Sequence, residues 1–268
     1  MYYADLHVHT TTSDCSMEVE EILKMAKEKG ITHIAFTDHD TTQDAKEHQD
    51  LAESYGIYGI PGIEMSAYDL KIQKKVHILG YGYSSTKHIE EIGRETLRRR
   101  NANCLKQIEI LNELGYCVPV EEIQKLSRSC IYKQHIFDYL VQTGQTEKMF
   151  GEIYKYIFKN GGPCDFDIEY PAAEDVVKSI KEDGGAAVLA HPGQQGNFEI
   201  ITRLVEAGLS GIEWNHPSHG ESDKKIIEDY AQRYDLFLTG GSDFHGRYEN
   251  QSAAIGAFPA HESSKRLF

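Results

Sequence analysis

The sequence predicts an α/β fold, a barrel of about seven strand and helix units interrupted by a helical insertion. Short apolar runs alternate with amphipathic stretches along most of the chain, a rhythm typical of parallel strands joined by right-handed crossovers. Histidine and carboxylate residues recur where several different strands are expected to end. This distribution favours a barrel, whose loops converge on one site, over an open sheet, where such residues gather at one switch point.

The N-terminal part of the chain is expected to supply two helices and four strands. The segment 17–30 repeats its apolar residues at helical spacing and ends at Gly30, a C-terminal helix signal. A second helix is expected from Ala45 to Tyr55. The four expected strands cover residues 4–9, 33–38, 56–67 and 75–83.

The C-terminal part repeats this alternation and completes the barrel. Apolar residues at helical spacing predict further helices, and short apolar runs predict the strands between them. The expected helices cover residues 173–185, 198–209 and 224–235. The expected strands cover residues 186–193, 210–216 and 236–246, which brings the total to seven.

Between residues 87 and 170 the alternation stops and helices follow one another. The expected helices cover residues 88–115, 118–129, 132–144 and 148–162. Their connections are short, so we expect a packed subdomain and not a linker. The predicted organisation is therefore a barrel of residues 1–86 and 171–268, with residues 87–170 as a cap over its C-terminal mouth.

The composition narrows the compartment and the partners. With 42 acidic and 28 basic residues the chain carries a formal charge of −14, which disfavours a broad nucleic-acid surface but leaves room for a small phosphorylated substrate or a short oligonucleotide. No apolar run approaches the ~18–20 residues of a membrane span, and no signal peptide opens the chain. Five scattered cysteines without a CxxC pair are expected to be reduced thiols. We therefore expect a cytoplasmic protein with no membrane partner.

The strongest local signal for chemistry is the pair His7 and His9 at the end of the first strand. Residues two apart on a strand share a face, so both imidazoles can hold one cation, although two half-exposed strand histidines would show the same spacing. Further histidines and carboxylates follow other strands, where each alone could be a helix cap or a turn residue. These residues are Asp14, His39, Glu64, His77, His191, Asp243 and His245.

Together these six histidines and three carboxylates form a predicted metal-binding set. Nine ligands are too many for one ion of four to six ligands and suit two or three divalent ions. Nitrogen and oxygen ligands without a thiolate suit Zn, Mn or Fe. Ions ~3.5–4 Å apart clamp a phosphoryl group and generate hydroxide near neutral pH, so the hypothesis is metal-dependent phosphoester hydrolysis by a metal-bridging hydroxide.

Six segments, in chain order, resemble the motifs of the polymerase-and-histidinol-phosphatase (PHP) phosphoesterases. They are DLHVHTTTSD, FTDHD, PGIEMS, VHILGY, LAHPG and GSDFHG. The resemblance implies a distorted seven-stranded barrel with a trinuclear metal centre, and Asp5 and Asp38 as residues that orient ligand imidazoles. It assigns the first metal to His7, His9, Glu64 and Asp243, the second to Asp14, His39 and His245, and the third to Glu64, His77 and His191.

The insertion resembles that of the PHP subgroup that hydrolyses nucleoside 3′,5′-bisphosphates and related small phosphates, or trims RNA from its 5′ end. In that subgroup an Arg-Pro-His motif of the insertion grips substrate phosphate. Here the segment reads Tyr132-Lys133-Gln134-His135, so His135 persists and Lys133 stands where Arg is usual. Because Lys cannot offer a bidentate fork, a cyclic phosphodiester of a sugar phosphate also remains open as the substrate.

The loop after the sixth strand supplies the other expected substrate contacts. His216, Ser218 and His219 lie there, and loops at this face of a barrel usually line the site, although a polar loop satisfied by its own backbone would look the same. His191 or His216 is expected to protonate the leaving group. The run Arg98 to Arg100 is interpreted as a solvated helix face.

The prediction is thus a phosphoric ester hydrolase acting on a small phosphomonoester or a cyclic phosphodiester. A histidinol-phosphate-type phosphatase is the nearest alternative, and a catalytically silent PHP module that binds nucleotides is another. An amidohydrolase-type barrel would use a modified lysine as bridging ligand, a place that Glu64 fills here.

Overall fold

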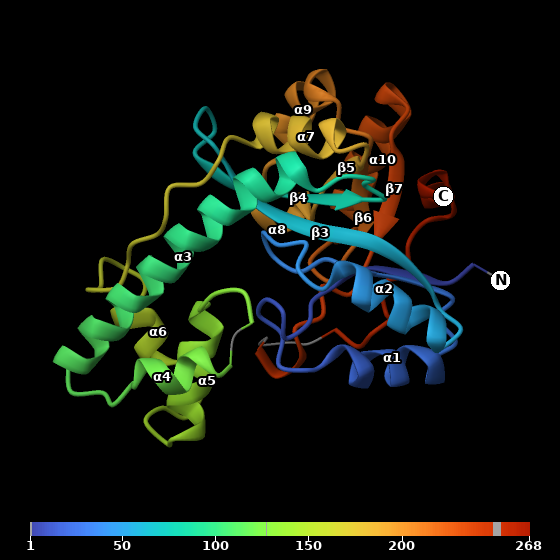
Figure 1. Cartoon of the computed structure of the whole chain (residues 1–268). Helices are drawn as coiled ribbons and strands as arrows, with labels where there is room; N and C mark the ends of the chain where they lie inside the picture. The colour runs from blue at the N-terminus through green and yellow to red at the C-terminus, as the bar shows by residue number, and fades with distance from the viewer. Residues whose placement is uncertain (1, 127, 249–252) are drawn as a thin grey trace.

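The computed structural model describes residues 2–126, 128–248 and 253–268 and contains one sheet of seven strands in chain order. The sheet curls into a nearly closed barrel, because Val8 at the end of the first strand forms a parallel bridge with Phe244 beyond the last (Figure 1). The strands are β1 Ala4–Val8, β2 His33–Phe36, β3 Tyr58–Asp69, β4 Lys74–Tyr81, β5 Ala186–Leu189, β6 Gly211–Asn215 and β7 Phe237–Gly240. The predicted α/β barrel is confirmed.

One strand departs from the expected parallel arrangement. β4 pairs antiparallel with both β3 and β5, whereas the other neighbours in the sheet pair in parallel. The physical reason is the short turn between Asp69 and Lys74, since a parallel connection needs a dozen or more residues to cross over. His77 consequently enters the barrel mouth from the middle of β4, opposite Ser66, and not from a strand end.

The helices between the strands cover the barrel as predicted. In α1 the buried residues Ile22, Leu23 and Ala26 form an apolar stripe that packs against β1 and β2 through one core cluster. These helices are α1 Val19–Glu28, α2 Ala45–Ser54, α7 Ala173–Glu182, α8 Pro192–Gln195, α9 Ile201–Ala207 and α10 Glu221–Tyr234. Short 3₁₀ turns add Phe198–Ile200, Gly246–Tyr248 and Glu262–Leu267.

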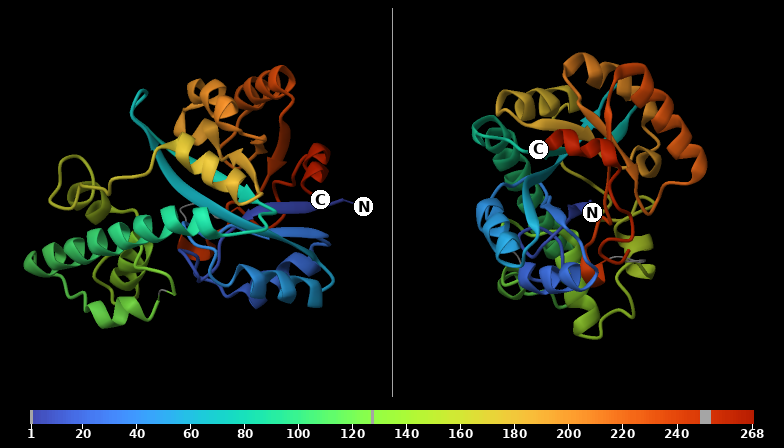
Figure 2. Two further views of the ribbon diagram at one scale, coloured as in Figure 1. Left: turned by 45° about the horizontal axis from the view of Figure 1, so that its top comes forward. Right: turned by 90° about the vertical axis from the view of Figure 1, so that its right-hand side faces the viewer.

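Among the described residues, four helices lie between β4 and α7, where the alternation stops in the sequence. They are α3 Lys87–Glu113, α4 Val120–Gln124, α5 Lys133–Gln142 and α6 Glu152–Ile157, with α4 and α6 shorter than the sequence predicted. These inserted helices have their own apolar cluster, which includes Ile108, Ile136 and Phe158. They extend away from the barrel along α3 (Figure 2).

Helix α3 is fixed to the barrel at its first turn. Asp183, after α7, accepts hydrogen bonds from the backbone N–H groups of His88 and Ile89 at 2.9 Å each, which satisfies two donors that the helix itself leaves unpaired. With 27 residues, the helix is ~40 Å long at 1.5 Å per residue. Within the described ranges, no helix is both long enough and apolar enough to cross a membrane.

Candidate metal centre

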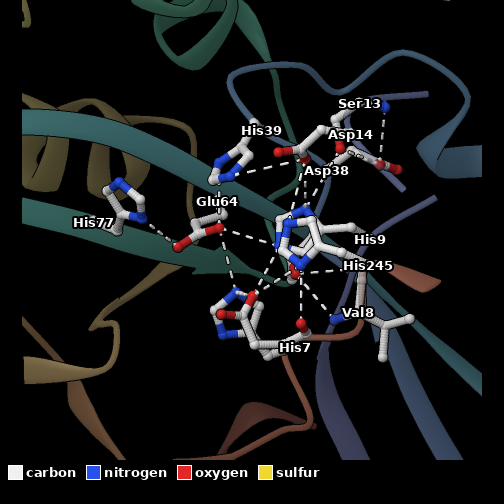
Figure 3. Close-up of polar contacts among 12 residues, drawn as sticks. His7, Val8, His9, Ser13, Asp14, Asp38, His39, Glu64, His77 and His245 are labelled. Atoms are coloured by element: carbon white, nitrogen blue, oxygen red, sulfur yellow. Dashed lines mark hydrogen bonds and ion pairs between the residues drawn. The ribbon is translucent and has the colours of Figure 1, made fainter. Parts of the chain in front are cut away.

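Glu64 lies at the middle of the predicted ligand set and contacts five of its six histidines. Figure 3 shows it with His7, His9, His39 and His77. Its Oε2 lies 3.3, 3.2 and 3.2 Å from nitrogens of His7, His9 and His39. Its Oε1 lies 2.7 Å from His77 Nδ1 and 2.9 Å from His191 Nε2. Burial opposes ionisation of Glu64, but the surrounding imidazoles outweigh it and hold its pKa well below the usual range.

Asp243 faces Glu64 from the loop after β7. Its Oδ1 lies 3.2 Å from His7 Nε2 and 3.3 Å from His9 Nε2, so both carboxylates converge on the same pair of imidazoles. Its backbone has φ 52°, and its N–H donates to the carbonyl of His7 at 2.8 Å. Aspartate tolerates this left-handed conformation better than most residues, and the turn directs the carboxylate back into the mouth.

A third carboxylate, Asp14, lies close to His245, the sixth histidine of the set, and to His9 and His39. Its Oδ1 lies 3.3 Å from His245 Nε2 and 3.8 to 3.9 Å from nitrogens of His9 and His39. Its Oδ2 accepts a hydrogen bond of 2.7 Å from Gln134 Nε2 on α5. Burial opposes its ionisation, yet the neighbouring imidazoles hold its pKa below the usual range.

The ligand atoms fall into three overlapping groups, each with all atoms within 4.8 Å of one another. These groups are His7, His9, Glu64 and Asp243; His9, Asp14, His39 and His245; and His39, Glu64 and His77. The first matches the grouping expected from sequence. The second gains His9, and in the third His39 takes the place expected for His191, whose Nε2 still contacts Glu64.

The donor atoms themselves fit divalent cations. Within the described part of the chain, His7 Nε2, His9 Nε2, His39 Nδ1 and Asp14 Oδ1 are buried and make no hydrogen bond. Unpaired buried polar atoms are costly, and a cation among them would satisfy several at once. Imidazole nitrogen with carboxylate oxygen is a donor set of Zn, Mn and Fe sites.

The close approach of two backbones explains how His7 reaches this position. A Cβ on Gly241 would lie 2.3 Å from the His7 Cβ, so a side chain there would push β1 away from the loop after β7. Only glycine permits this contact, which brings His7 and Asp243 together.

Glu213 on β6 binds the ring nitrogen of His7 that faces away from Glu64, and it was not predicted from the sequence. Its Oε1 accepts from His7 Nδ1 at 2.9 Å and its Oε2 accepts from the His191 N–H at 2.8 Å. Burial opposes ionisation of Glu213, but His7 and His216 lower its pKa to about 2. The available signal was a carboxylate in the middle of an apolar strand, which needs a buried partner.

Asp5 and Asp38 were expected to orient ligand imidazoles, but within the described residues neither carboxylate contacts one of these imidazoles directly. Asp5 accepts backbone N–H groups of Ser242 at 2.9 Å and Gly256 at 2.7 Å. Asp38 accepts from the loop after β1, including Ser13 Oγ at 2.6 Å, and reaches His9 only through that hydroxyl. Both carboxylates therefore fix loop backbones.

The residues predicted to contact substrate lie in three different settings. His216 and Ser218 line a cavity of about 450 Å³ over the metal-binding set. Lys133 lines an adjoining cavity of about 240 Å³. His135 and His219 line neither: His135 accepts from the Tyr132 N–H at the start of α5, and His219 bridges the Gly193 N–H and the Trp214 carbonyl.

His216 and His191 face the centre differently. His216 Nδ1 accepts from the Ser218 N–H at 3.1 Å, which leaves its Nε2–H to point at Asp243 Oδ2, 3.2 Å away. His191 Nε2 lies 2.9 Å from Glu64, inside the metal-binding set. The geometry thus gives His216 a proton at the cavity and commits His191 to Glu64.

The arginine run on α3 is not a uniform solvated face. Arg98 is exposed and Arg99 is partly buried, and both pair with Glu95. Arg100 instead turns inward and donates to Asp40 Oδ2 at 2.7 Å and Ser66 Oγ at 2.8 Å. Helical spacing from the buried residues Thr96 and Cys104 was the signal for this orientation.

Comparisons with known proteins identify the family to which the chain belongs. A family model for the PHP domain matches residues 5–187. The chain is 44% identical to the phosphoribosyl 1,2-cyclic phosphate 1,2-diphosphodiesterase of Eggerthella lenta, over 91% of this chain and 94% of that protein. It is 29% identical to the 3′,5′-nucleoside bisphosphate phosphatase of Chromobacterium violaceum, over 90% and 86%.

Two solved structures share the whole architecture. A Bifidobacterium adolescentis protein assigned as a metal-dependent phosphoesterase superposes with a TM-score of 0.89 at 26% identity, over 99% of this chain and 94% of that one. A Chromobacterium violaceum amidohydrolase with bound sulfate and no metal superposes with a TM-score of 0.82 at 26% identity, over 94% and 90%. Motifs, fold and relatives agree, and the chain belongs to the PHP family of metal-dependent phosphoesterases, hydrolases of phosphoric esters.

Proposed function

We propose that this enzyme hydrolyses a cyclic phosphodiester of a phosphorylated sugar. The observation that carries the proposal is the 44% identity, over nearly the full length of both chains, to a protein named as a phosphoribosyl cyclic phosphate diphosphodiesterase. Identity to the nucleoside bisphosphate phosphatase is 29%. The presence of Lys133 where that subgroup is expected to carry arginine supports the same choice, because lysine binds phosphate as a point charge.

The proposed cofactor is a set of three divalent ions, Mn, Fe or Zn, held by the nine predicted ligands. One ion would bind His7, His9, Glu64 and Asp243; the second Asp14, His39 and His245, with His9 beside them; the third Glu64, His77 and His191. When bound, such ions polarise phosphoryl oxygens and lower the pKa of water.

The protein residues would then position the substrate and manage the proton. Water oxygen bonds to phosphorus and gives up a proton to solvent, one ring P–O bond breaks, and the leaving oxygen takes up a proton. His216 is the proposed donor, because it lines the cavity with its Nε2–H and Ser218 holds its other nitrogen. His191 is the less suitable donor because it is itself one of the nine predicted metal ligands, whereas His216 is not.

Residues 87–170 are proposed to act as a substrate cap over the barrel of residues 1–86 and 171–268. Three contacts bring these helices to the mouth: Gln134 donates to Asp14, Ser129 Oγ donates to the Thr12 carbonyl at 2.6 Å, and Tyr132 Oη donates to the His39 carbonyl at 3.0 Å. Such a cap would exclude water and choose the substrate while the barrel carries out the chemistry.

The test is a comparison of kcat/KM across four substrates with manganese-loaded enzyme. These are ribose 5-phosphate 1,2-cyclic phosphate, a nucleoside 3′,5′-bisphosphate, a 5′-phosphorylated oligoribonucleotide and histidinol phosphate, with products followed by phosphorus NMR. We expect the cyclic phosphodiester to be preferred by at least ~10-fold, a difference of ~1.4 kcal/mol in transition-state binding.

Faster turnover of any of the other three would contradict the proposal and assign that substrate class instead. Turnover of none of them, together with less than one ion per chain after Mn, Fe or Zn supplementation, would favour the catalytically silent module.

A further inference from the structure

A group of buried polar residues joins the metal-binding set to α3. Asp40 follows the predicted ligand His39, and Ser66 stands two positions after the predicted ligand Glu64. Asp40 Oδ1 accepts a hydrogen bond of 2.7 Å from the Ser66 N–H, and its Oδ2 accepts one of 2.9 Å from Ser66 Oγ. The Asp40 carboxylate therefore ties the loop after β2 to β3, next to two residues of the set.

Helix α3 packs directly on the backbone of Asp40. This residue has φ 57°, and its N–H donates to the Glu64 carbonyl at 2.9 Å. A Cβ on Gly93 of α3 would lie 2.4 Å from the Asp40 carbonyl oxygen, so a side chain at that position would push the helix away from the loop. The contact sets α3 against the residue that follows His39 in the chain.

Arg100 holds the side chain of Asp40 from the same helix. It lies seven positions, about two turns, after Gly93 and so shares its face, and long helical side chains point back toward the N-terminus. Its Nη2 donates to Asp40 Oδ2 at 2.7 Å and to Ser66 Oγ at 2.8 Å. The Arg100 side chain is 18% exposed and that of Asp40 is 0% exposed, so the two charges match each other in a largely desolvated setting. The ion pair therefore acts on the position of protein groups.

Tyr132, at the start of α5, contacts both Arg100 and His39. The Arg100 Cζ lies 5.1 Å from the centroid of the Tyr132 ring, and Tyr132 Oη donates to the His39 carbonyl at 3.0 Å. The Tyr132 side chain is buried. His39 is thus held at its own carbonyl by Tyr132 and at the next residue by Arg100.

His39 is shared between two of the predicted ion sites. Its Nδ1 lies 3.2 Å from Glu64 Oε2, and its Nε2 lies 3.9 Å from Asp14 Oδ1. It belongs to two of the three groups of ligand atoms, whereas the group that includes His7 and Asp243 does not contain it. A shift of His39 would therefore disturb two ion sites and leave the third one unchanged.

We propose that Arg100 and Tyr132 are positioning residues for His39, through which the inserted helices hold one side of the metal centre in place. This inference rests on the three divalent ions of the proposed function and not on the identity of its substrate. Loss of residues that orient metal ligands typically lowers metal affinity ~10- to 100-fold. The ions that share His39 are therefore expected to bind more weakly without this support, while the ion beside His7 and Asp243 stays bound.

The experiment titrates Mn²⁺ into the metal-free protein by calorimetry, counts bound ions by elemental analysis, and measures urea unfolding of the metal-free protein in parallel. Tyr132→Phe removes only a hydroxyl and is expected to weaken Mn²⁺ binding by ~10-fold at the sites that share His39, with little loss of stability. Arg100→Met is expected to weaken it by ~100-fold and to lower stability as well, because the Asp40 carboxylate stays buried without its cation. Arg100→Lys is expected to recover most of the affinity, since one ammonium can donate to both Asp40 and Ser66.

Arg203→Met is the matched control for the loss of stability. The Arg203 side chain is 23% exposed, similar to that of Arg100, and it pairs with Asp69 and Glu174 away from both cavities at the metal centre. This variant is expected to unfold more easily but to bind Mn²⁺ as wild type does.

Tyr3→Phe is the control for Tyr132→Phe, because the Tyr3 hydroxyl also donates to a backbone carbonyl, that of Gly256 at 2.8 Å, outside the predicted ligand set. It is expected to leave Mn²⁺ affinity unchanged. Weaker Mn²⁺ binding in Tyr132→Phe and Arg100→Met, but in neither control, supports the inference. Wild-type affinity in both variants, or an equal loss of affinity in Arg203→Met, would overturn it.

Metal binding and turnover separate this inference from the proposed function. Less than one ion bound per chain of wild type would overturn the proposed metal set and, with it, the support of His39. Mn²⁺ binding that depends on Arg100 and Tyr132, without turnover of any of the four substrates, would contradict the proposed reaction and still support the positioning role.

Discussion

The barrel mouth and the inserted helices differ in how their polar residues are held. In the mouth, nine imidazoles and carboxylates contact one another, and Glu64 alone touches five of them. The inserted helices instead pack around their own apolar cluster and present separate cations toward the mouth. The difference supports the proposal that the barrel supplies the chemistry and the inserted helices supply the selection of substrate.

The barrel mouth and the inserted helices also differ in the sign of their charge. The mouth collects carboxylates that cations can neutralise, whereas Arg100 and Lys133 of the inserted helices face it with positive charge. A phosphorylated substrate bound between the two, as proposed, would be attracted by both. Changes on the barrel side are therefore expected to remove catalysis, and changes on the helical side, Arg100 and Tyr132 apart, to alter preference or stability.

The largest effect is expected from Glu64→Gln, which keeps the side-chain shape but removes the charge that five imidazoles share. Loss of several kcal/mol of metal-dependent stabilisation corresponds to a decrease of kcat/KM on the order of 10³-fold. The measurement is phosphoester hydrolysis, with bound metal counted by elemental analysis. His33→Gln, a histidine that stacks on Phe268 outside the set, is the control. Activity within tenfold of wild type would show that catalysis does not depend on the carboxylate at the middle of the barrel mouth.

The second-largest expected effect is a dependence of stability on pH, and its source is His135 on α5 of the inserted helices. Burial of His135 lowers its pKa to about 4, against the opposing carboxylates Asp14 and Asp138. The unfolded state therefore binds more protons between that value and the ordinary histidine pKa near ~6.5, so stability is complete above pH ~6.5 and falls as the pH drops.

His135→Leu removes this dependence. Between pH 7 and pH 4 the wild-type free energy of unfolding should fall by about 3 kcal/mol more than that of the variant, the equivalent of the pKa difference. Urea unfolding with a chelator in every sample provides the measurement, and His261→Leu, an exposed histidine, is the control. Parallel stability curves for wild type and His135→Leu would show that His135 is not neutral in the folded protein.

Glu213→Gln is expected to have an intermediate effect. The variant keeps an acceptor for His7 Nδ1 but weakens the charge that orients this ring, and loss of such partners typically costs ~10- to 100-fold in metal affinity or activity. Metal titration and kcat/KM are both measured, with Glu228→Gln as the control because Glu228 accepts a hydrogen bond from Trp214 at the surface, outside the predicted ligand set. Unchanged metal affinity and activity in this variant would show that Glu213 does not contribute to metal binding.

The smallest effect is expected at the ion pair between Arg247 and Asp138. Its two hydrogen bonds of 2.9 and 2.8 Å join the loop after β7 to α5, but Arg247 is half-exposed. Arg247→Ala should lower the free energy of unfolding by less than ~1 kcal/mol and raise KM more than it changes kcat. A large loss of kcat would show instead that the inserted helices also align the catalytic groups.

Much of the barrel and the ligand set could be predicted because both depend on local patterns. His7 and His9 are two apart on a strand, and the other ligands follow apolar runs that can be read in the sequence. The reversed direction of β4 was also readable, since the chain between residues 67 and 75 is too short for a crossover.

The adjoining cavity that Lys133 lines could not be predicted in the same way. Lys75 meets Asp167 across 92 positions of sequence, and Lys133 acquires its setting only when α5 packs against the mouth. Arg100 and Glu213 are intermediate cases. Each had a local signal, a buried helical stripe or a carboxylate within an apolar strand, but its partner depends on tertiary contacts.

The two ends of the inserted segment lie side by side. The chain leaves the barrel along α3 and returns next to it, where Arg99 donates to the Glu169 carbonyl at 2.8 Å and the Tyr68 N–H donates to the Pro171 carbonyl at 2.9 Å. The segment thus enters and leaves the barrel at neighbouring points of the chain path, like a long loop, and its helices make further contacts with the barrel mouth. Over evolution such a segment can be lengthened, shortened or exchanged without changing the order of the seven strands, so new substrates can be acquired while an old metal centre is inherited intact.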